Sequence, residues 1–405
     1  MNRLFDVLTS GVLLILLLPF LLYRALLAYV QTQTIFTREP RLGYRQRPFY
    51  WLSFSGDQIG KGLAVIFNVL RGDLAWAGVR ALSSAEAALL PIEANQHFDL
   101  QPGVVSAFSI KQKVGLAYDD EFVTDHAFFT NISTKNYIAL CVRAIIGLLL
   151  GGGKTRPTPP MLHFWGVNIV NTTMAEALDW IEQCVRNQQK SVLAFVNPAC
   201  LNIAYTNETY RHVLQQADRV LPDGIGIKIG CRLLGQSLMA NVNGTDLFPR
   251  LCERAAEGGY SLFLLGGQAG IAEKTAAAMQ ERYPKLIITG VQDGYFSDEK
   301  EPEVIDMINR SGASVLLVGF GVPKQELWLA RCRAQLNPAV CMGIGGLFDF
   351  YSGRIPRAPV WLREIGMEWS WRLMQEPGRM WQRYLIGNPL FLYRVWLQRQ
   401  QGAKL

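Results

Sequence analysis

Apolar residues form one long run near the start of the chain. Residues 7–23 contain no charged side chain and are dominated by leucine, and after Arg24 the apolar pattern continues through residues 25–30. A helix of that length can enter a lipid bilayer. Pro19 lies within the run and lacks the backbone N–H that a regular helix uses. The pattern therefore predicts an N-terminal membrane helix that either spans straight or is kinked and re-entrant.

A second apolar stretch, residues 137–150, is shorter and contains Arg143. It predicts a core or interfacial helix rather than a membrane span. Three glycines and then a proline-rich segment follow, so residues 151–160 are predicted to form a Gly/Pro linker at a domain boundary. We place a small, membrane-associated helical domain at residues 1–150, before this linker.

Short apolar runs alternate with amphipathic segments beyond Pro160. Buried strands are predicted at residues 191–196, 261–265, 286–291, 315–318 and 340–344. Helices with the 3.6-residue period are predicted at residues 173–187, 270–283, 302–311 and 325–335. This alternation predicts an α/β domain at residues 161–353, with a Rossmann-like parallel sheet and helices on both of its faces.

The composition lies between that of a soluble enzyme and that of a membrane protein, with 50% hydrophobic and 18% charged residues in a chain of 405. The net charge of +7 favours a polyanionic partner. Arginine and tryptophan interleave beyond Gly353, a mixture typical of the lipid headgroup interface, so membrane lipid is favoured and no nucleic acid partner is expected. Residues 354–405 are predicted to be a basic, Trp-rich segment that serves both the membrane and the active site.

Neither a metal site nor a disulfide framework is expected. The seven cysteines include no CxxC pair, and the four histidines have no metal-ligand spacing. No Asp-x-Asp sequence occurs, so the usual carboxylate pair that holds a metal on a nucleotide sugar is missing. The charge of a diphosphate would then be met by backbone amides and by arginine or lysine.

The loops after the predicted strands carry the candidate chemistry, because ligands of open α/β sheets bind at the carboxyl ends of the strands. Gly266 and Gly267 follow one strand and lead into a helix, where backbone amides can approach a diphosphate. Gly319 begins a similar turn, with Lys324 and Gln325 offering a charge and an amide at the same rim. Glycines at such turns are more often plain turn formers, and these observations leave that alternative open.

Asp223 stands between Pro222 and Gly224, just before a predicted helix at residues 224–234. A helix-capping role would account for an aspartate at this position. The segment 243–246 opens the next helix and allows the same interpretation.

Taken together, these residues resemble the WecG/TagA/CpsF glycosyltransferase family over roughly residues 163–384. The motifs that carry the resemblance are Asn197-Pro198, Leu221-Pro222-Asp223-Gly224-Ile225-Gly226, Gly244-Thr245-Asp246, Leu265-Gly266-Gly267, Asp293-Gly294-Tyr295-Phe296, Gly319-Phe320-Gly321-Val322-Pro323-Lys324-Gln325-Glu326 and Gly345-Gly346-Leu347-Phe348-Asp349-Phe350. Arg354, Arg357, Glu368, Trp369 and Arg372 follow in matching order.

The resemblance implies a hexosyltransferase that uses no cofactor and no metal. It implies inverting transfer of an N-acetylhexosamine-type sugar, such as N-acetylmannosamine or its uronic acid, from a UDP donor to a polyprenyl-diphosphate-linked sugar in surface polysaccharide synthesis. Asp223 falls where the family's proposed catalytic base lies, which favours the catalytic interpretation over the cap. The residues predicted to bind substrate are Asn197, Gly244, Thr245, Asp246, Gly266, Gly267, Gly319, Pro323, Lys324, Gln325, Glu326, Arg354, Arg357 and Arg363.

The N-terminal part carries, in order, Arg3, Asp6, the apolar run with Pro19, Arg41, Gly43, Pro48, Phe49, Asn68-Val69-Leu70-Arg71-Gly72-Asp73, Gly78, Arg80, Pro102 and Gly103. From Arg3 to about Leu150 these residues resemble a second family, the polyprenyl-phosphate hexose-1-phosphate transferases. The expected Lys-Phe-Arg segment of that family reads Ser53-Phe54-Ser55, and the stretch that should hold its catalytic Asp-Glu pair is deleted between Asp57 and Gly62. These departures predict a degenerate domain that only anchors the protein. The expected location is the bacterial inner membrane with the catalytic domain on the cytoplasmic side, and a homo-oligomer is left open.

Two other functional classes compete with this interpretation. A dinucleotide-dependent oxidoreductase would explain Gly266, Gly267 and Gly270 after a strand and Asp293 after the next one, although the full G-x-G-x-x-G is absent. A non-catalytic scaffold of a polysaccharide assembly complex would use the same folds without turnover. Thermal stabilisation of the protein by UDP rather than NAD would distinguish the glycosyltransferase from the oxidoreductase. Turnover of a UDP-sugar would distinguish it from the scaffold.

Overall fold

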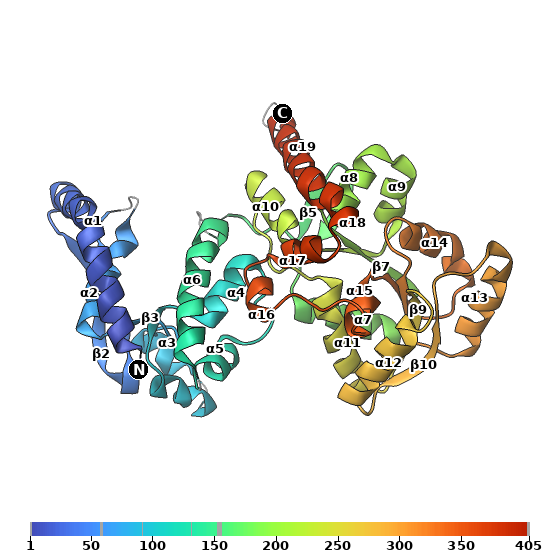
Figure 1. The fold of residues 1–405 in the computed structure, drawn as a ribbon, viewed down its shortest axis with the longest axis horizontal. Helices are drawn as coiled ribbons and strands as arrows, with labels where there is room; N and C mark the ends of the chain where they lie inside the picture. Colours follow the sequence, from blue (N-terminus) through green and yellow to red (C-terminus); the bar gives the residue numbers. More distant parts are fainter. Residues whose placement is uncertain (1, 57–59, 91, 131, 152–155, 403–405) are drawn as a thin grey trace. The chain divides into compact units, whose positions relative to one another are not determined.

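The computed structural model describes residues 2–56, 60–90, 92–130, 132–151 and 156–402. The chain forms two compact units (Figure 1). Unit 1 comprises Met1–Lys113 and Asp119–Gly152, and unit 2 comprises Val114–Tyr118 and Gly153–Leu405. The expected linker at residues 151–160 and the expected deletion between Asp57 and Gly62 both fall partly outside the described residues. A feature that no pattern in the sequence indicated is the passage of residues 114–118 through unit 2.

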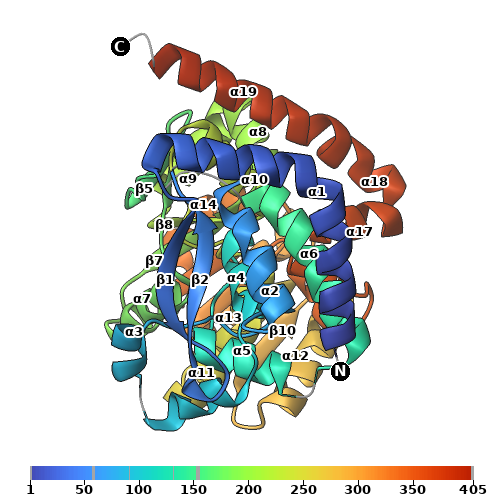
Figure 2. The ribbon, with the colours of Figure 1, turned by 90° about the vertical axis from the view of Figure 1, so that its left-hand side faces the viewer.

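Unit 1 contains the expected N-terminal apolar helix, α1 (Arg3–Thr32), and Figure 2 shows it changing direction within its length. Pro19 lies inside α1 and is the kind of residue that kinks a helix. Leu21 of α1 packs with Leu52 and Phe54 of a neighbouring strand, while most other apolar side chains of the helix stay exposed. The helix is long and apolar enough to cross a membrane.

The rest of unit 1 is more mixed than the helical domain that the sequence predicts. An antiparallel pair, β1 (Phe36–Leu42) and β2 (Pro48–Phe54), and a short parallel pair, β3 (Ala75–Ala77) and β4 (Gly103–Val105), accompany the helices. The second apolar stretch forms α6 (Thr134–Gly151), and Tyr137 and Leu140 lie in the core, so the expected core helix is confirmed. The remaining helices are α2 (Val65–Arg71), α3 (Ser84–Ala88), α4 (Ala107–Val114) and α5 (Glu121–Phe129).

Unit 2 is built on a six-stranded, fully parallel sheet with the strand order β10-β9-β11-β12-β7-β8. The α/β fold class is therefore confirmed for this unit. An antiparallel hairpin, β5 (Met161–Phe164) and β6 (Val167–Val170), precedes the sheet. The sheet strands are β7 (Ser191–Val196), β8 (Arg219–Pro222), β9 (Ser261–Gly266), β10 (Ile287–Gln292), β11 (Val315–Gly319) and β12 (Val340–Gly343).

Helices cover both faces of this sheet, because successive strand residues point to opposite sides. Leu193 and Phe195 of β7 pack on one face with α7 (Met174–Arg186) and α11 (Gly244–Gly258). Ala194 and Val196 pack on the other face. The helices on the first face also include α12 (Ile271–Arg282) and α15 (Leu347–Tyr351), and those on the second are α8 (Pro198–Thr206), α9 (Glu208–Gln216), α10 (Ile225–Leu233), α13 (Glu301–Arg310) and α14 (Lys324–Cys332).

The C-terminal segment belongs to the core of unit 2. Phe391 and Val395 are fully buried, and the Phe391 ring lies 5.9 Å from that of Phe164 in β5. The segment contains α16 (Val360–Arg363), α17 (Glu368–Gln375), α18 (Pro377–Trp381), a π-helical turn η6 (Gln382–Ile386) and α19 (Gly387–Gly402). This packing places the segment beside the carboxyl ends of β7 and β8.

Candidate active site

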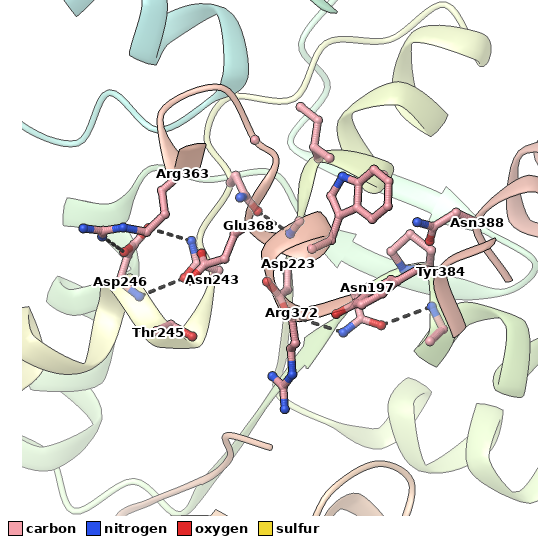
Figure 3. A pocket seen from close by; sticks show the side chains of 18 of the residues that line it. Asn197, Asp223, Asn243, Thr245, Asp246, Arg363, Glu368, Arg372, Tyr384 and Asn388 are labelled. Carbon is pink, nitrogen blue, oxygen red and sulfur yellow. Dashed lines mark hydrogen bonds and ion pairs between the residues drawn. The ribbon is translucent and has the colours of Figure 1, made fainter. Parts of the chain in front are cut away.

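A pocket opens at the carboxyl ends of β7 and β8, and we call it the Asp223 pocket (Figure 3). The strands supply Asn197 and Asp223 from their following loops, and the loop before α11 supplies Thr245 and Asp246. The C-terminal segment supplies a wall with Arg363, Glu368, Trp369, Arg372, Arg383, Tyr384 and Asn388. The sequence-predicted residues that meet here are Asn197, Asp223, Thr245, Asp246 and Arg363.

Asn197 fixes the turn after β7. Its side-chain Oδ1 accepts hydrogen bonds from the backbone N–H groups of Ala199 at 3.1 Å and Cys200 at 3.2 Å, so it is the N-cap of α8. Because that oxygen is engaged, the amide Nδ2 points the other way and donates to Asp223 Oδ2 at 3.4 Å. The asparagine therefore holds a helix and orients the carboxylate at once.

Asp223 does not cap a helix. The N-cap of α10 is Gly224, at φ 94°, and no side chain caps this terminus. The Asp223 backbone N–H donates to Val196 at 2.8 Å, which ties the turn after β8 to the end of β7. The capping alternative for Asp223 is thus wrong, and its carboxylate faces the pocket instead.

The two carboxylates of the pocket experience different electrostatic environments. Burial raises the pKa of Asp223, against the opposing effects of the Asn197 hydrogen bond and the Arg383 charge. Burial also opposes ionisation of Asp246, but Arg357, Asn243 and Arg363 together outweigh it and lower the pKa of that carboxyl. Paired carboxylates whose pKa values are pushed apart suit different tasks. Asp223 is suited to accept a proton, and Asp246 to remain a fixed negative charge.

Asp246 is the centre of a network that joins distant parts of unit 2. Asn243 caps α11 through the Asp246 backbone N–H at 2.8 Å, and its Nδ2 donates to Asp246 Oδ2 at 2.8 Å. Arg357 lies between Asp246, at 2.5 Å, and Glu368, at 3.0 Å. Arg363 approaches the same carboxylate at 4.0 Å. The expectation that Asn243 opens a helix is confirmed.

A second cavity, of about 660 Å³, lies at the carboxyl ends of the other strands. We call it the glycine cavity, because six of the residues that line it are glycines. Gly267, Gly319, Lys324 and Arg354 are the sequence-predicted residues that line it, together with Gly294, Gly321, Gly345, Gly346 and Asp349. Lys324 and Arg354 bring positive charge to this wall.

The glycines of this cavity permit a close approach of two loops. A Cβ on Gly266, at φ 139°, would lie 2.7 Å from the backbone of Gly319. The Gly267 N–H donates to the Gly319 carbonyl at 3.2 Å, and the Gly294 N–H donates to the Gly267 carbonyl at 2.9 Å. Packing alone therefore requires glycine at residue 266, and the N–H groups of Gly267 and Gly294 are engaged in holding the loops together.

Gln325 and Glu326 are not at the rim of either cavity. Gln325 is 1% exposed, and its Oε1 accepts from the backbone N–H groups of Gly321 at 3.2 Å and Gly345 at 2.9 Å. Its Nε2 donates to Glu326 Oε1 at 2.8 Å. The expectation of an amide at the rim is thus wrong, because the Gln325 amide lies beneath the loops and fixes their shape. Burial raises the pKa of Glu326 to about 7.

The three arginines predicted to hold a diphosphate have separate positions. Arg363 lines the Asp223 pocket, and Arg354 lines the glycine cavity, where it pairs with Asp349 at 2.8 Å. Arg357 lines neither and is taken up by Asp246 and Glu368. Gly244, Gly266 and Pro323 also lie off both lining surfaces, at the start of α11, the end of β9 and the start of α14.

Several residues in the Asp223 pocket, or in contact with its lining, were not predicted from the sequence. Asn241 accepts a hydrogen bond from the Gly224 N–H at 2.6 Å, and Tyr118 reaches Asp246 from a segment far upstream. Arg383 and Tyr384 come from the π-helical turn. The paired asparagines on either side of Val242 were a usable signal, since asparagine favours turns and caps. Tyr118 had no such signal.

Comparisons with known proteins bear on the family of this chain. The profile of the glycosyl transferase WecG/TagA/CpsF family matches residues 162–405. An N-acetylglucosaminyldiphosphoundecaprenol N-acetyl-beta-D-mannosaminyltransferase of Bacillus spizizenii is 30% identical over 239 residues, which are 59% of this chain and 91% of that protein. A protein of the same name from Bacillus subtilis is 32% identical over 217 residues, 53% of this chain and 84% of its own length. These relatives are transferases, which leaves the oxidoreductase alternative without support.

Proposed function

We propose, since the chain belongs to the WecG/TagA/CpsF glycosyltransferase family, that it moves an N-acetylhexosamine-type sugar from a UDP donor to a polyprenyl-diphosphate-linked sugar. N-acetylmannosamine and its uronic acid are the donor sugars that we favour. The relatives are named as mannosaminyltransferases acting on N-acetylglucosaminyldiphosphoundecaprenol. Their names support an acceptor of the same class for this chain.

The position of the Asp223 carboxylate is the observation that carries this proposal. It faces the pocket, Asn197 orients it, and burial raises its pKa toward the range in which a general base is useful. In the proposed reaction the acceptor hydroxyl gives its proton to Asp223 while its oxygen bonds to C1 of the donor sugar. The bond from C1 to the UDP oxygen breaks on the opposite face, and UDP leaves with the electron pair. Inversion at C1 follows.

The glycine cavity is the proposed place of the donor diphosphate. Lys324 and Arg354 line this cavity and supply the positive charge that a diphosphate needs without a metal. Arg363, in the Asp223 pocket, is the proposed partner of the acceptor diphosphate.

The protein is proposed to work on the cytoplasmic face of the bacterial inner membrane. In unit 1, α1 exposes an apolar surface. In unit 2, the C-terminal segment exposes Trp381 and Trp396, along with Leu385, Ile386 and Tyr393. Apolar and aromatic side chains of this kind, flanked by arginines, suit a lipid interface. Unit 1 is proposed to be a degenerate phosphosugar transferase that serves only as an anchor.

A donor panel tests the proposal. Full-length protein is incubated with UDP-N-acetylmannosamine, its uronic acid, UDP-N-acetylglucosamine or UDP-glucose and a short-chain polyprenyl-diphosphate N-acetylglucosamine acceptor. We expect one N-acetylhexosamine-type donor to give a disaccharide product of the corresponding mass and one UDP per transfer. Release of UMP, or no product from any donor, would contradict the proposal.

A further inference from the structure

We propose that residues 115–118 complete the acceptor side of the Asp223 pocket, with Tyr118 as a positioning residue that holds the loop carrying Asn241, Asn243 and Asp246. This inference rests on the proposed function, because it assigns the acceptor to the Asp223 pocket. The family match begins at residue 162, so these residues lie outside the part of the chain that the family shares. The chain thus adds a wall of its own to the family's site.

The path of the chain brings this segment into unit 2. Helix α4 ends at Val114, residues 114–118 pack as part of unit 2, and α5 begins at Glu121 back in unit 1. Leu116 lines the Asp223 pocket directly. A single short pass of chain therefore contributes both an apolar lining residue and a polar anchor.

Backbone contact fixes the start of the segment. The Asn241 N–H donates to the Gly115 carbonyl at 2.7 Å. Gly115 has φ +83°, and a Cβ there would lie 3.2 Å from the Asn241 nitrogen, so glycine allows this approach. The side chain of Asn241 in turn accepts from the Gly224 N–H at 2.6 Å. Gly224 follows Asp223, so a chain of two hydrogen bonds runs from the segment to the turn of the proposed base.

The Tyr118 hydroxyl fixes the other end of the same loop. It donates to the Asn241 carbonyl, and it accepts from Asn243 Nδ2 at 3.1 Å. Asp246 Oδ2 lies 3.3 Å away. The Arg250 guanidinium lies 5.1 Å from the centre of the Tyr118 ring, within cation–π range. Burial raises the pKa of Tyr118 well above its usual range, so the phenol keeps its proton and remains a donor.

Loss of this hydroxyl would leave the loop without its tether. The Asn241 carbonyl and the Asn243 amide would lose a partner beside a buried carboxylate, and buried polar groups without partners are costly. The loop would shift, and with it Asp246, which sets the position of Arg363. Tyr118 therefore acts through its neighbours, and its removal is expected to weaken acceptor binding rather than donor binding.

The test is Tyr118→Phe in the full-length protein, with Tyr260→Phe as the matched control. The second variant also removes one hydroxyl from a buried tyrosine of unit 2, but the Tyr260 hydroxyl has no hydrogen-bond partner within the described residues. For each variant we would measure the Kd of the polyprenyl-diphosphate N-acetylglucosamine acceptor, the Kd of UDP, kcat, KM and the melting temperature.

We expect Tyr118→Phe to raise the acceptor Kd and to lower kcat/KM for the acceptor by about tenfold, the loss typical of one hydrogen bond near a charged group. The Kd of UDP should not change, and Tyr260→Phe should change neither. Equal acceptor binding in Tyr118→Phe and wild type, or equal losses in both variants, would overturn the inference. Failure of the wild type to transfer any sugar would overturn the proposed function instead, whereas acceptor binding would still decide the role of Tyr118.

Discussion

The two cavities at one edge of the same sheet differ in what forms their walls. In the Asp223 pocket, side chains are hydrogen-bonded to one another: Asn197 donates to Asp223, and Asn243 donates to Asp246. In the glycine cavity, six glycines contribute to the wall, and the buried amide of Gln325 fixes the loops at Gly321 and Gly345. Under the proposed function, Asp223 accepts a proton in one cavity and the other cavity binds the donor diphosphate.

The physical reason for the difference is the precision that each task needs. Proton transfer requires a single carboxylate within hydrogen-bond reach of a hydroxyl, and Asn197 orients the Asp223 carboxylate for this. A diphosphate is a diffuse charge that several cations can share. Two loops that approach as closely as those at Gly266 and Gly319 must lack Cβ atoms where they meet.

The largest effect is expected from Asp223→Asn. Asparagine keeps the shape of the side chain and can still accept from Asn197, but it cannot take a proton. We expect kcat to fall by about a hundredfold or more, the usual range for loss of a general base, with the Kd of UDP unchanged. Asp349→Asn in the glycine cavity is the matched control and should retain most of kcat. A similar loss of kcat in both variants would remove the distinction between the cavities.

The next effect concerns the loop contact of the glycine cavity. Gly266→Ala places a methyl group within 2.7 Å of the Gly319 backbone in a conformation that only glycine adopts readily, at φ 139°. We expect the free energy of unfolding to fall by about 2–5 kcal/mol. Gly259→Ala is the control: its φ is 70° and no atom lies near the added group, so about 1 kcal/mol is expected. Urea titration of both variants measures the difference, and equal losses would refute the role of the close contact.

Most of the sheet could be predicted from the sequence, and β8 shows why one strand could not. Strands that are buried in a parallel sheet consist of continuous apolar runs. Such runs predict β7, β9, β11 and β12 at nearly their observed bounds. β8 has four residues, begins with Arg219 and ends with Pro222, and so lacks such a run. Its hydrogen-bonded pairing with β7, rather than an apolar pattern in its own sequence, defines it as a strand.

The arginines should separate the two cavities by substrate. Arg354→Gln should raise the KM of the donor about tenfold and leave the acceptor KM unchanged, since Arg354 lines the glycine cavity. Arg363→Gln should do the opposite, because it lines the Asp223 pocket. Initial rates on a water-soluble acceptor, with each substrate varied in turn, measure both constants. If each variant raises both KM values equally, the cavities do not bind separate substrates.

The smallest effect on activity is expected from Glu326→Gln, because Glu326 does not lie at the rim of either cavity. Because the pKa of Glu326 is raised to about 7 from its usual 4.5, the folded state holds a proton that the unfolded chain releases. The stability contribution of this group is therefore lost as pH rises from about 4.5 through 7. Compared with wild type, Glu326→Gln should gain stability across that window and keep its UDP affinity.

Urea titrations between pH 4 and 8 measure this difference, with the exposed Glu303→Gln as the control. The Glu326 variant and wild type should diverge as pH rises, whereas the Glu303 variant should follow wild type. Parallel curves for all three proteins would show that Glu326 does not titrate in this range.

The site was less predictable than the sheet, because its walls come from segments far apart in the sequence. Asp223 and Asn197 could be found, since each directly follows a strand and the carboxyl ends of parallel strands share an edge. Arg357 was expected to bind a diphosphate, but its burial between Asp246 and Glu368 depends on tertiary packing. No local pattern could show that Tyr118 leaves its neighbours and enters unit 2.

The ion pairs of Arg357 also have a consequence for local opening of the fold. This arginine joins the first turn of α11 to the first turn of α17, and it lies 111 residues from Asp246 and 11 residues from Glu368 in the sequence. Release of either turn separates Arg357 from one of its two partly buried partners, so we expect the two turns to open as one cooperative unit. Their amide hydrogens should then exchange with solvent with a common free energy of opening, and the two turns should be protected or released together when the pocket fills.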